Sequence, residues 1–194
     1  MGHQGDSYEG GAQQTMKNIL LGVTGSIAAY KAADIANRLT KAGCSVKVVM
    51  TGAAERFITP LTFQTLTKNK VYTDMFALDD PSRVAHIALA HEADLFLVAP
   101  ASADFIAKAA AGIADDMLTT VLLAVKDIPV LIAPAMNTAM YDNKVTQRNM
   151  RTLAELGFGF IEPREALLAC GDVGRGALAE TDLIVERALK ALEG

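Results

Sequence analysis

Four short apolar runs in this sequence are each followed at once by a turn rich in small residues. The runs cover residues 17–23, 45–50, 93–100 and 131–134. Stretches with helical periodicity separate them, so strands and helices alternate along the chain. That alternation predicts a three-layer α/β/α fold with a right-handed, doubly wound parallel sheet. In such a sheet the turns that follow the strands meet at the carboxyl edge, where ligands bind.

Length and composition indicate one globular domain. The chain has 194 residues, of which 51% are hydrophobic and 21% are charged. This composition supplies a sizeable core and argues against disorder. Pro, Gly or charged residues interrupt the apolar runs before they reach membrane-spanning length. The net charge of −4 gives no reason to expect nucleic acid or an anionic membrane surface as a partner.

The ends of the domain and its compartment are predicted from simple features. Residues 1–15 are polar and rich in Gly and Gln, which indicates a flexible arm or an appended tag, with Met16 as a natural start. The folded domain is then expected over residues 16–194. Cys44 and Cys170 lie far apart and outside any metal-type Cys/His cluster. They suit free thiols in a reducing compartment such as the cytoplasm.

The first strand ends in a glycine turn, residues 22–26, that leads into a helix over residues 27–42. Its backbone N–H groups and the helix N-terminus can face a phosphate, and Ser26 can cap the helix or bind that phosphate. The spacing is not G-x-G-x-x-G, and the second strand ends in Met50-Thr51 rather than in an acidic residue. A mononucleotide is therefore favoured over a dinucleotide. The alternative is a capped helix that binds no ligand.

Two charged or metal-type patterns favour ordinary structural roles. His86 and His91 lie on a predicted helix over residues 84–92, but a spacing of five does not place them on one helical face as metal ligands. Asp115 and Asp116 could form an acidic catalytic or metal site. Capping of the helix that follows is the favoured interpretation, because helices prefer Asp at their N-termini.

The turn after the strand at residues 131–134 places Asn137 between Met136 and Met140. Its amide offers both a donor and acceptors in an apolar setting, which suits a carboxylate or the edge of a ring. The alternative is a polar loop tip without a ligand.

A long aperiodic segment, residues 163–181, contains several glycines and Cys170. Loops of this length in compact domains are usually functional or disordered, and glycines permit movement like that of a flap. Cys170 could instead be a small packing residue, although that role suits regular elements better. A last helix is predicted over residues 181–192, with Thr181 as its cap.

Six motifs in order, spanning residues 16–194, resemble the flavin-containing cysteine decarboxylase family. Within it the similarity is greatest to the phosphopantothenoylcysteine decarboxylases of coenzyme A biosynthesis, including the decarboxylase half of bifunctional bacterial proteins. The motifs are Gly25-Ser26-Ile27-Ala28-Ala29-Tyr30-Lys31, His86-Ile87 ahead of Ala93-Asp94-Leu95, Pro100-Ala101-Ser102-Ala103-Asp104, Gly112-Ile113-Ala114-Asp115-Asp116, Pro134-Ala135-Met136-Asn137 and Ala169-Cys170-Gly171-Asp172.

The resemblance implies a Rossmann-like flavoprotein fold with FMN as cofactor. It also implies decarboxylation of 4′-phospho-N-pantothenoylcysteine to 4′-phosphopantetheine and CO₂. The steps would be thiol oxidation to a thioaldehyde, decarboxylation to an enethiolate, and reduction by the reduced flavin. His86 is then the expected base, Cys170 the proton donor on a flap, and Asn137 the carboxylate ligand, with Ala169, Gly171 and Asp172 also near substrate. The implied FMN site comprises Gly25, Ser26, Ile27, Thr51, Ser102, Ala103, Asp104, Phe105 and Ala135.

The same resemblance implies a homotrimer or homododecamer with FMN between subunits. It also implies a phosphopantothenate–cysteine ligase fused to this domain or following it in the native protein. Three other functions are weighed against this one. The peptidyl-cysteine decarboxylases of lanthipeptide-type maturation need no flap cysteine, so the motif around Cys170 argues against them. Asn137 together with Cys170 does not suit a flavin prenyltransferase, and the addition of His86 argues against a flavin-binding phosphatase subunit.

Overall fold

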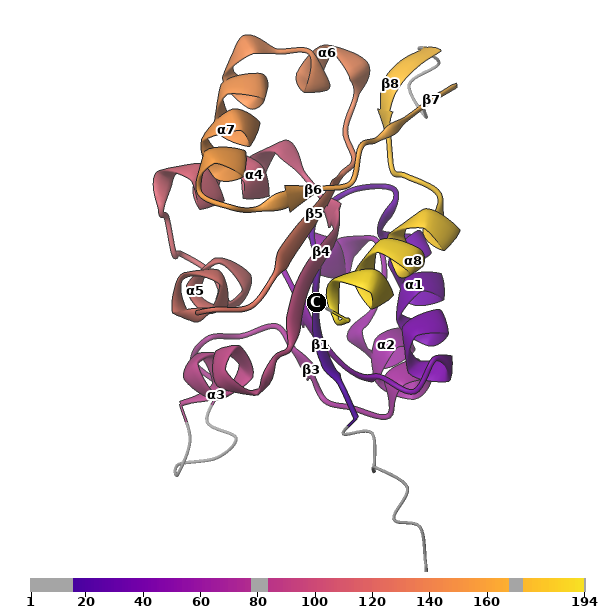
Figure 1. The fold of residues 1–194 in the computed structure, drawn as a ribbon, viewed down its shortest axis with the longest axis vertical. Helices are drawn as coiled ribbons and strands as arrows, with labels where there is room; N and C mark the ends of the chain where they lie inside the picture. Colours follow the sequence, from indigo (N-terminus) through magenta and orange to yellow (C-terminus); the bar gives the residue numbers. More distant parts are fainter. Residues whose placement is uncertain (1–15, 78–83, 168–172, 194) are drawn as a thin grey trace, which may run out of the picture.

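The central feature is a six-stranded parallel sheet between two layers of helices (Figure 1). The computed structural model describes residues 16–77, 84–167 and 173–193. The strand order is β3-β2-β1-β4-β5-β6, which is the order of doubly wound nucleotide-binding folds. The predicted α/β/α architecture is therefore confirmed. The strands are β1 Asn18–Val23, β2 Ser45–Met50, β3 Val71–Tyr72, β4 Leu95–Ala101, β5 Val130–Pro134 and β6 Gly159–Phe160.

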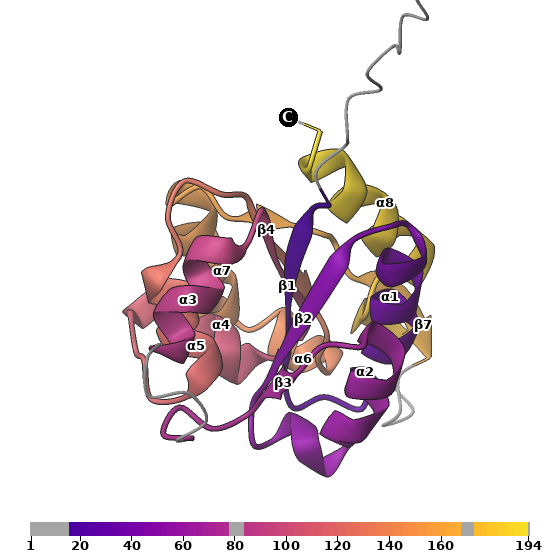
Figure 2. The same cartoon turned by 90° about the horizontal axis from the view of Figure 1, so that it is seen from below.

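The two faces of the sheet are covered by different sets of helices, as Figures 1 and 2 show. Side chains alternate along β1, so that Ile19 and Leu21 join one core cluster and Leu20 joins the other. The first cluster is completed by α1 Ala29–Lys41, α2 Pro60–Thr67 and α8 Thr181–Ala191. The second is completed by α3 Ala85–Glu92, α4 Ala103–Ala111, α5 Met117–Ala124 and α7 Lys144–Glu155.

Helix ends follow local chemistry that the sequence displays. Gly112, at φ +67°, ends α4 in the left-handed region and so separates α4 from α5. Asp116 caps α5, because its side chain accepts from the N–H of Thr119 and the Thr119 side chain reaches back to the Asp116 N–H. The capping interpretation of this acidic residue is confirmed.

The chain after β6 differs from the sequence prediction. An aperiodic loop was expected over residues 163–181, but β7 Arg164–Leu167 and β8 Val173–Ala177 pair there as an antiparallel hairpin. Thr181 is the first residue of α8 rather than its cap, and its hydroxyl donates to Asp34 at 2.9 Å. Residues 168–172 lie outside the described residues. Two short elements complete the fold: the 3₁₀ turn η1 Ala54–Arg56 and the helix α6 Thr138–Tyr141.

Candidate functional site

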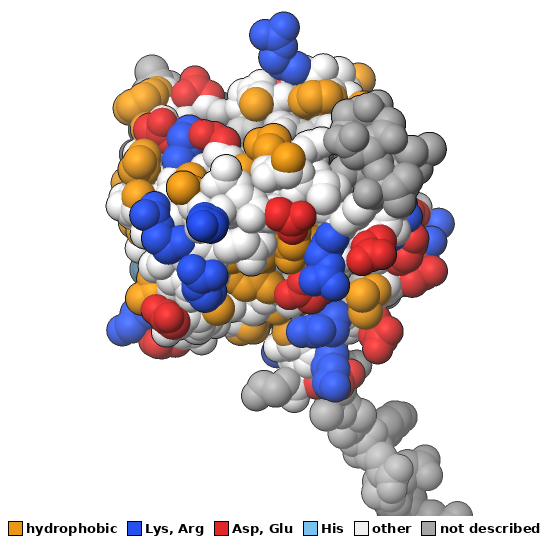
Figure 3. Space-filling model, turned by 90° about the horizontal axis from the view of Figure 1, so that it is seen from above, with side chains coloured by type: hydrophobic (Ala, Val, Ile, Leu, Met, Phe, Trp, Pro, Cys, Tyr) orange, Lys and Arg blue, Asp and Glu red, His pale blue; other side chains and the backbone are white. Residues whose placement is uncertain are grey.

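A cavity of about 860 Å³ lies at the carboxyl edge of the sheet. Its volume lies toward the upper end of the range of about 300–1,000 Å³ that is usual for ligand sites. The turns after β1, β2, β4 and β5 line it, together with the β7–β8 hairpin. Figure 3 looks down on this end of the molecule and shows hydrophobic side chains between groups of basic and acidic ones. The predicted convergence of the four small-residue turns is confirmed.

The turns after β1 and β2 approach each other closely. A Cβ added to Gly25 would lie 2.6 Å from the Cβ of Ala53, so only glycine permits this approach. Around Gly52, by contrast, a Cβ would meet nothing within 4 Å. The two turns therefore form a narrow floor of small residues that opens toward the cavity.

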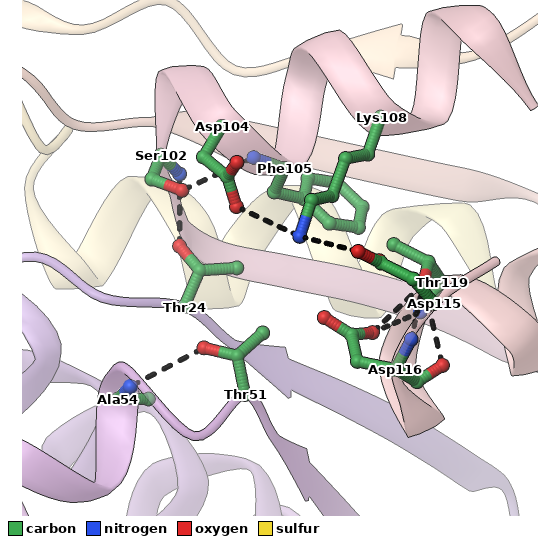
Figure 4. Close-up of polar contacts among 10 residues, drawn as sticks. All are labelled: Thr24, Thr51, Ala54, Ser102, Asp104, Phe105, Lys108, Asp115, Asp116 and Thr119. Carbon is green, nitrogen blue, oxygen red and sulfur yellow. Dashed lines mark hydrogen bonds and ion pairs between the residues drawn. The ribbon is translucent and has the colours of Figure 1, made fainter. Parts of the chain in front are cut away.

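Three hydroxyl groups lie on the turns after β1, β2 and β4, and each accepts a hydrogen bond from a backbone N–H two or three residues later. Ser26 Oγ accepts from the N–H of Ala28, and Thr51 Oγ1 accepts from the N–H of Ala54, both at 3.2 Å. Ser102 Oγ accepts from the N–H of Phe105 at 3.2 Å, which caps α4 (Figure 4). A hydroxyl that accepts in this way keeps its own O–H as a donor. The three groups can therefore donate to a phosphate or a polyol chain.

Most of the cofactor residues expected from sequence share this cavity, and one does not. Phe105 is 1% exposed and packs in the core, where only its backbone N–H takes part in the turn. Phe57, which no sequence motif marks, also lines the cavity, whereas Phe63 is fully buried in the core. The expected residues that do line the cavity are Gly25, Ser26, Ile27, Thr51, Ser102, Ala103, Asp104 and Ala135.

Asn137 also lines the cavity, on the turn between β5 and α6. Its side chain accepts a hydrogen bond of 2.8 Å from the N–H of Ala139, which fixes the orientation of the amide. Ala135, Met136 and Met140 surround it with apolar surface on the same wall. This wall suits a planar ring beside one oriented amide.

Lys108 is a cavity residue that the sequence motifs do not reveal. Its ammonium group lies between Asp104, at 3.4 Å, and Asp115, at 3.2 Å (Figure 4). Partial burial works against the charge, but the hydrogen bond to Asp115 and the charges of both carboxylates outweigh it and raise the pKa of Lys108. The helical spacing of Asp104 and Lys108 is the only sequence signal for this cluster.

Arg164 brings a second missed cation to the cavity wall, at the start of the hairpin. Its Nε donates to the carbonyl oxygen of Leu178 at 3.2 Å and lies 3.1 Å from Glu180. These contacts tie β7 to the segment before α8. Further lining residues outside the quoted motifs are Met140, Ala166 and Ala177, and Tyr30 and Lys31 of the first motif also line the cavity.

The expected base, His86, does not share the cavity with Asn137 within one chain. His86 lies on α3, half-buried, and is not among the residues that line the cavity. Figures 1 and 2 place α3 at the opposite side of the fold from the hairpin. The remaining expected residues, Ala169, Cys170, Gly171 and Asp172, lie outside the described residues. Within the described part of the chain, no group of three His, Cys, Asp or Glu side chains is arranged to hold a metal ion.

This fold and cavity are those of a flavoprotein: the family model described as Flavoprotein matches residues 7–193, and the chain belongs to that family. The chain is 54% identical over 172 residues to the probable phosphopantothenoylcysteine decarboxylase of Streptococcus mutans, covering 88% of this chain and 96% of that protein. It is 53% identical over 174 residues to the coenzyme A biosynthesis bifunctional protein CoaBC of Bacillus subtilis, covering 90% of this chain and 43% of that protein. The match thus spans less than half the length of this bifunctional relative.

Solved structures agree with this assignment. A phosphopantothenoylcysteine (PPC) decarboxylase mutant in complex with pantothenoylaminoethenethiol matches with a TM-score of 0.81 at 33% identity, covering 92% of this chain and 100% of that one. The FMN-dependent cysteine decarboxylase SpaF matches with a TM-score of 0.79 at 33% identity, covering 93% and 98%. No helix among the described residues is both long enough and apolar enough to cross a membrane.

Proposed function

We infer that the chain is an FMN-dependent phosphopantothenoylcysteine decarboxylase. It converts 4′-phospho-N-pantothenoylcysteine to 4′-phosphopantetheine and CO₂, a step of coenzyme A biosynthesis. The observation that carries this inference is the 54% identity to the Streptococcus mutans relative over nearly the whole of both chains. The lining of the cavity supports the cofactor and substrate roles proposed below for Ser26, Thr51, Ser102 and Asn137.

FMN fits the donor set of the cavity. The hydroxyls of Ser26, Thr51 and Ser102 provide donors for the phosphate and ribityl groups at the floor formed by Gly25 and its neighbours. The N-terminus of α1 adds partial positive charge beside them. Ala135 offers apolar surface for the ring. When bound, FMN supplies a reversible electron acceptor for the substrate thiol.

We propose that Asn137 holds the carboxylate that is lost. Its Oδ1 accepts from the N–H of Ala139, so its Nδ2 group is the part of the amide that can donate to a carboxylate. The apolar neighbours Met136 and Met140 disfavour a charged carboxylate relative to neutral CO₂. Ala169, Gly171 and Asp172 are proposed to complete the substrate contacts, and Cys170 to return a proton to the enethiolate carbon.

We propose that His86 acts in the cavity of a neighbouring copy, as the base of the reaction. In its own chain His86 does not line the cavity. Two residues near it in the chain are apolar and exposed, since Val84 is 59% exposed and Ile87 41%. Burying such a surface against a second copy is favourable. The proposed assembly is a homotrimer or a dodecamer built from trimers.

The proposed setting is the cytoplasm, beside a phosphopantothenate–cysteine ligase that supplies the substrate. The bifunctional relatives named for coenzyme A biosynthesis support this partner. Cys44, which is a free cysteine in the core, is compatible with a reducing compartment.

Mass analysis of reaction products tests the proposed function. The purified protein should be yellow, or become so with added FMN, and should release CO₂ from 4′-phospho-N-pantothenoylcysteine. A peptide that ends in cysteine serves as the competing substrate. Decarboxylation of the peptide alone would favour the alternative function, an oxidative peptidyl-cysteine decarboxylase, and a protein that takes up no FMN would contradict both.

A further inference from the structure

Strand β8 lies directly against the turn that carries Asn137. The carbonyl oxygen of Gly176 accepts a hydrogen bond of 2.9 Å from the N–H of Met136. Gly176 has a φ of +146°, and a Cβ placed on it would lie 2.4 Å from the carbonyl oxygen of Met136. Backbone cannot give way as a flexible side chain can. Only glycine therefore permits this contact.

A second glycine of β8 makes a matching contact with the same turn. The register of the hairpin shifts at Gly176, so strand alternation does not decide which way the two glycines face, but a Cβ on Gly174 would meet the same turn as one on Gly176. A Cβ on Gly174 would lie 2.7 Å from both Cγ2 and Oγ1 of Thr138. The Oγ1 of Thr138 is buried without a hydrogen-bond partner among the described residues. Gly176 and Gly174 of β8 thus contact Met136 and Thr138, the residues on either side of Asn137.

We propose that Gly174 and Gly176 are positioning residues for the Asn137 amide. Asn137 lies between the two contact points, and its side chain is anchored on the other side by the N–H of Ala139. The turn is therefore held both by its local hydrogen bonds and by the contacts with β8 on either side of Asn137. Displacing it moves the carboxylate ligand while the FMN floor, on the turns after β1 and β2, stays in place. This inference rests on the proposed function, which gives Asn137 its carboxylate.

Gly176→Ala tests the proposal, with Gly43→Ala as its control. Gly43 also has a positive φ, +89°, but a Cβ there meets nothing within 4 Å, and it follows α1 away from the cavity. Both variants carry backbone strain. Only Gly176→Ala should lower kcat/KM, by on the order of 10²-fold, as misplacement by about 1 Å can. FMN affinity, measured by quenching of FMN fluorescence, should stay at the parental value in both.

A comparison of substrate with product, which lacks the carboxylate, tests the position of Asn137 more directly than kcat/KM does. In Gly176→Ala the KM for substrate should rise, while the inhibition constant of 4′-phosphopantetheine, which lacks the carboxylate, should not change. Equal weakening for substrate and product, or parental kcat/KM, would overturn the proposal. If the parent protein releases no CO₂ from its substrate, the proposed function fails and this role of Asn137 fails with it.

Gly174→Ala keeps the proposal testable if Gly176→Ala does not fold. The atoms that obstruct a Cβ at Gly174 belong to the Thr138 side chain, so adding Thr138→Ala should restore kcat/KM lost in Gly174→Ala. Thr138→Ala alone removes a hydroxyl without a described partner and should keep parental activity. Strictly additive losses in this double-mutant cycle would contradict the contact.

Discussion

The backbone N–H of Ser102 donates a 2.8 Å hydrogen bond to the hydroxyl of Thr24, which joins the turns after β4 and β1. The same hydroxyl donates to the carbonyl oxygen of Pro100 at 2.8 Å. Thr24 is 1% exposed, so no water can replace these bonds. Because both turns line the cavity, this one side chain sets the spacing of two of its walls.

Thr24→Val should destabilise the protein and weaken FMN binding. Valine keeps the shape of threonine but leaves the partly buried Ser102 N–H without its acceptor, and a buried donor left unpaired costs about 1–3 kcal/mol. Urea unfolding measures the stability, and quenching of FMN fluorescence measures the affinity. Thr24→Ser keeps the hydroxyl and serves as the control. A valine variant as stable as the serine variant would show that the two turns are held by other contacts.

The sheet is predictable from sequence because its strands are buried on both faces. β4 is buried along its whole length, and such strands read as unbroken apolar runs. The run at residues 45–50 coincides with β2 for a different reason, because its β-branched residues alternate with the half-buried Ser45 and Lys47. Parallel strands also bring their following turns to one edge, so the cavity and most of its cofactor residues follow from the strand predictions alone.

The hairpin is not predictable in the same way. β8 reads Val-Gly-Arg-Gly-Ala, which has neither an apolar period nor β-branched enrichment. Its conformation depends on contacts with Met136 and Thr138, about 40 residues earlier in the chain. Local sequence patterns cannot predict contacts between such distant residues. The glycines that permit these contacts are also typical of flexible loops, so the sequence predicts a loop for this segment.

The sequence motifs also do not predict where His86 lies in the fold. They indicate that His86 and Asn137 serve one reaction but not that α3 lies on a different side of the fold from the hairpin. Lys108 was missed because a lysine four residues after an aspartate is common on exposed helices. Only the fold shows that Asp115, from beyond the helix, closes the cluster.

Asp116→Ala should lower stability by about 1 kcal/mol, the usual cost of removing an N-cap. The side chain accepts from the N–H of Thr119 at 2.8 Å, and the variant leaves that donor unpaired. Asp116→Asn keeps an acceptor oxygen and should lose less. Thermal or urea unfolding compares the three proteins. Equal losses in both variants would mean that the charge, rather than the cap, is what matters here.

Lys108→Met should destabilise the protein in a manner that depends on pH. Folding raises the pKa of Lys108 above its ordinary 10.5, so its stabilisation is complete below that pH and is lost as pH rises through the folded pKa. The difference in unfolding free energy between parent and variant should thus be larger at about pH 8 than at about pH 11. Urea unfolding at both values measures it.

Lys126→Met is the control for Lys108→Met. Lys126 is also paired with an aspartate, Asp127 at 3.7 Å, but its side chain is 85% exposed. Exposed pairs contribute little, about 0–1 kcal/mol. Its substitution should leave stability nearly unchanged at either pH. The same pH dependence in both variants would show that the Lys108 cluster stabilises no more than a surface pair does.

His86→Asn and Asn137→Ala should each abolish decarboxylation and should complement each other when the two chains are co-expressed with different tags. A cavity that takes Asn137 from one chain and His86 from its neighbour is intact wherever an Asn137→Ala chain supplies the histidine to a His86→Asn chain. Doubly tagged oligomers should therefore regain part of the parental CO₂ release. His86→Asn alone should still bind FMN, because His86 does not line the cavity of its own chain.

The complementation distinguishes a cavity that takes His86 and Asn137 from one chain from a cavity that takes them from two chains. Activity measurements on the single variants cannot make this distinction. If His86 reached Asn137 within one chain, every cavity in the mixed oligomer would lack one of the two groups, and activity would stay at the level of the single variants. A chain that carries both substitutions, mixed with His86→Asn, provides the control, because no intact histidine is then present. Recovery in the first mixture but not in the second would assign the histidine to the neighbouring subunit, since only a shared cavity can combine intact groups from two defective chains.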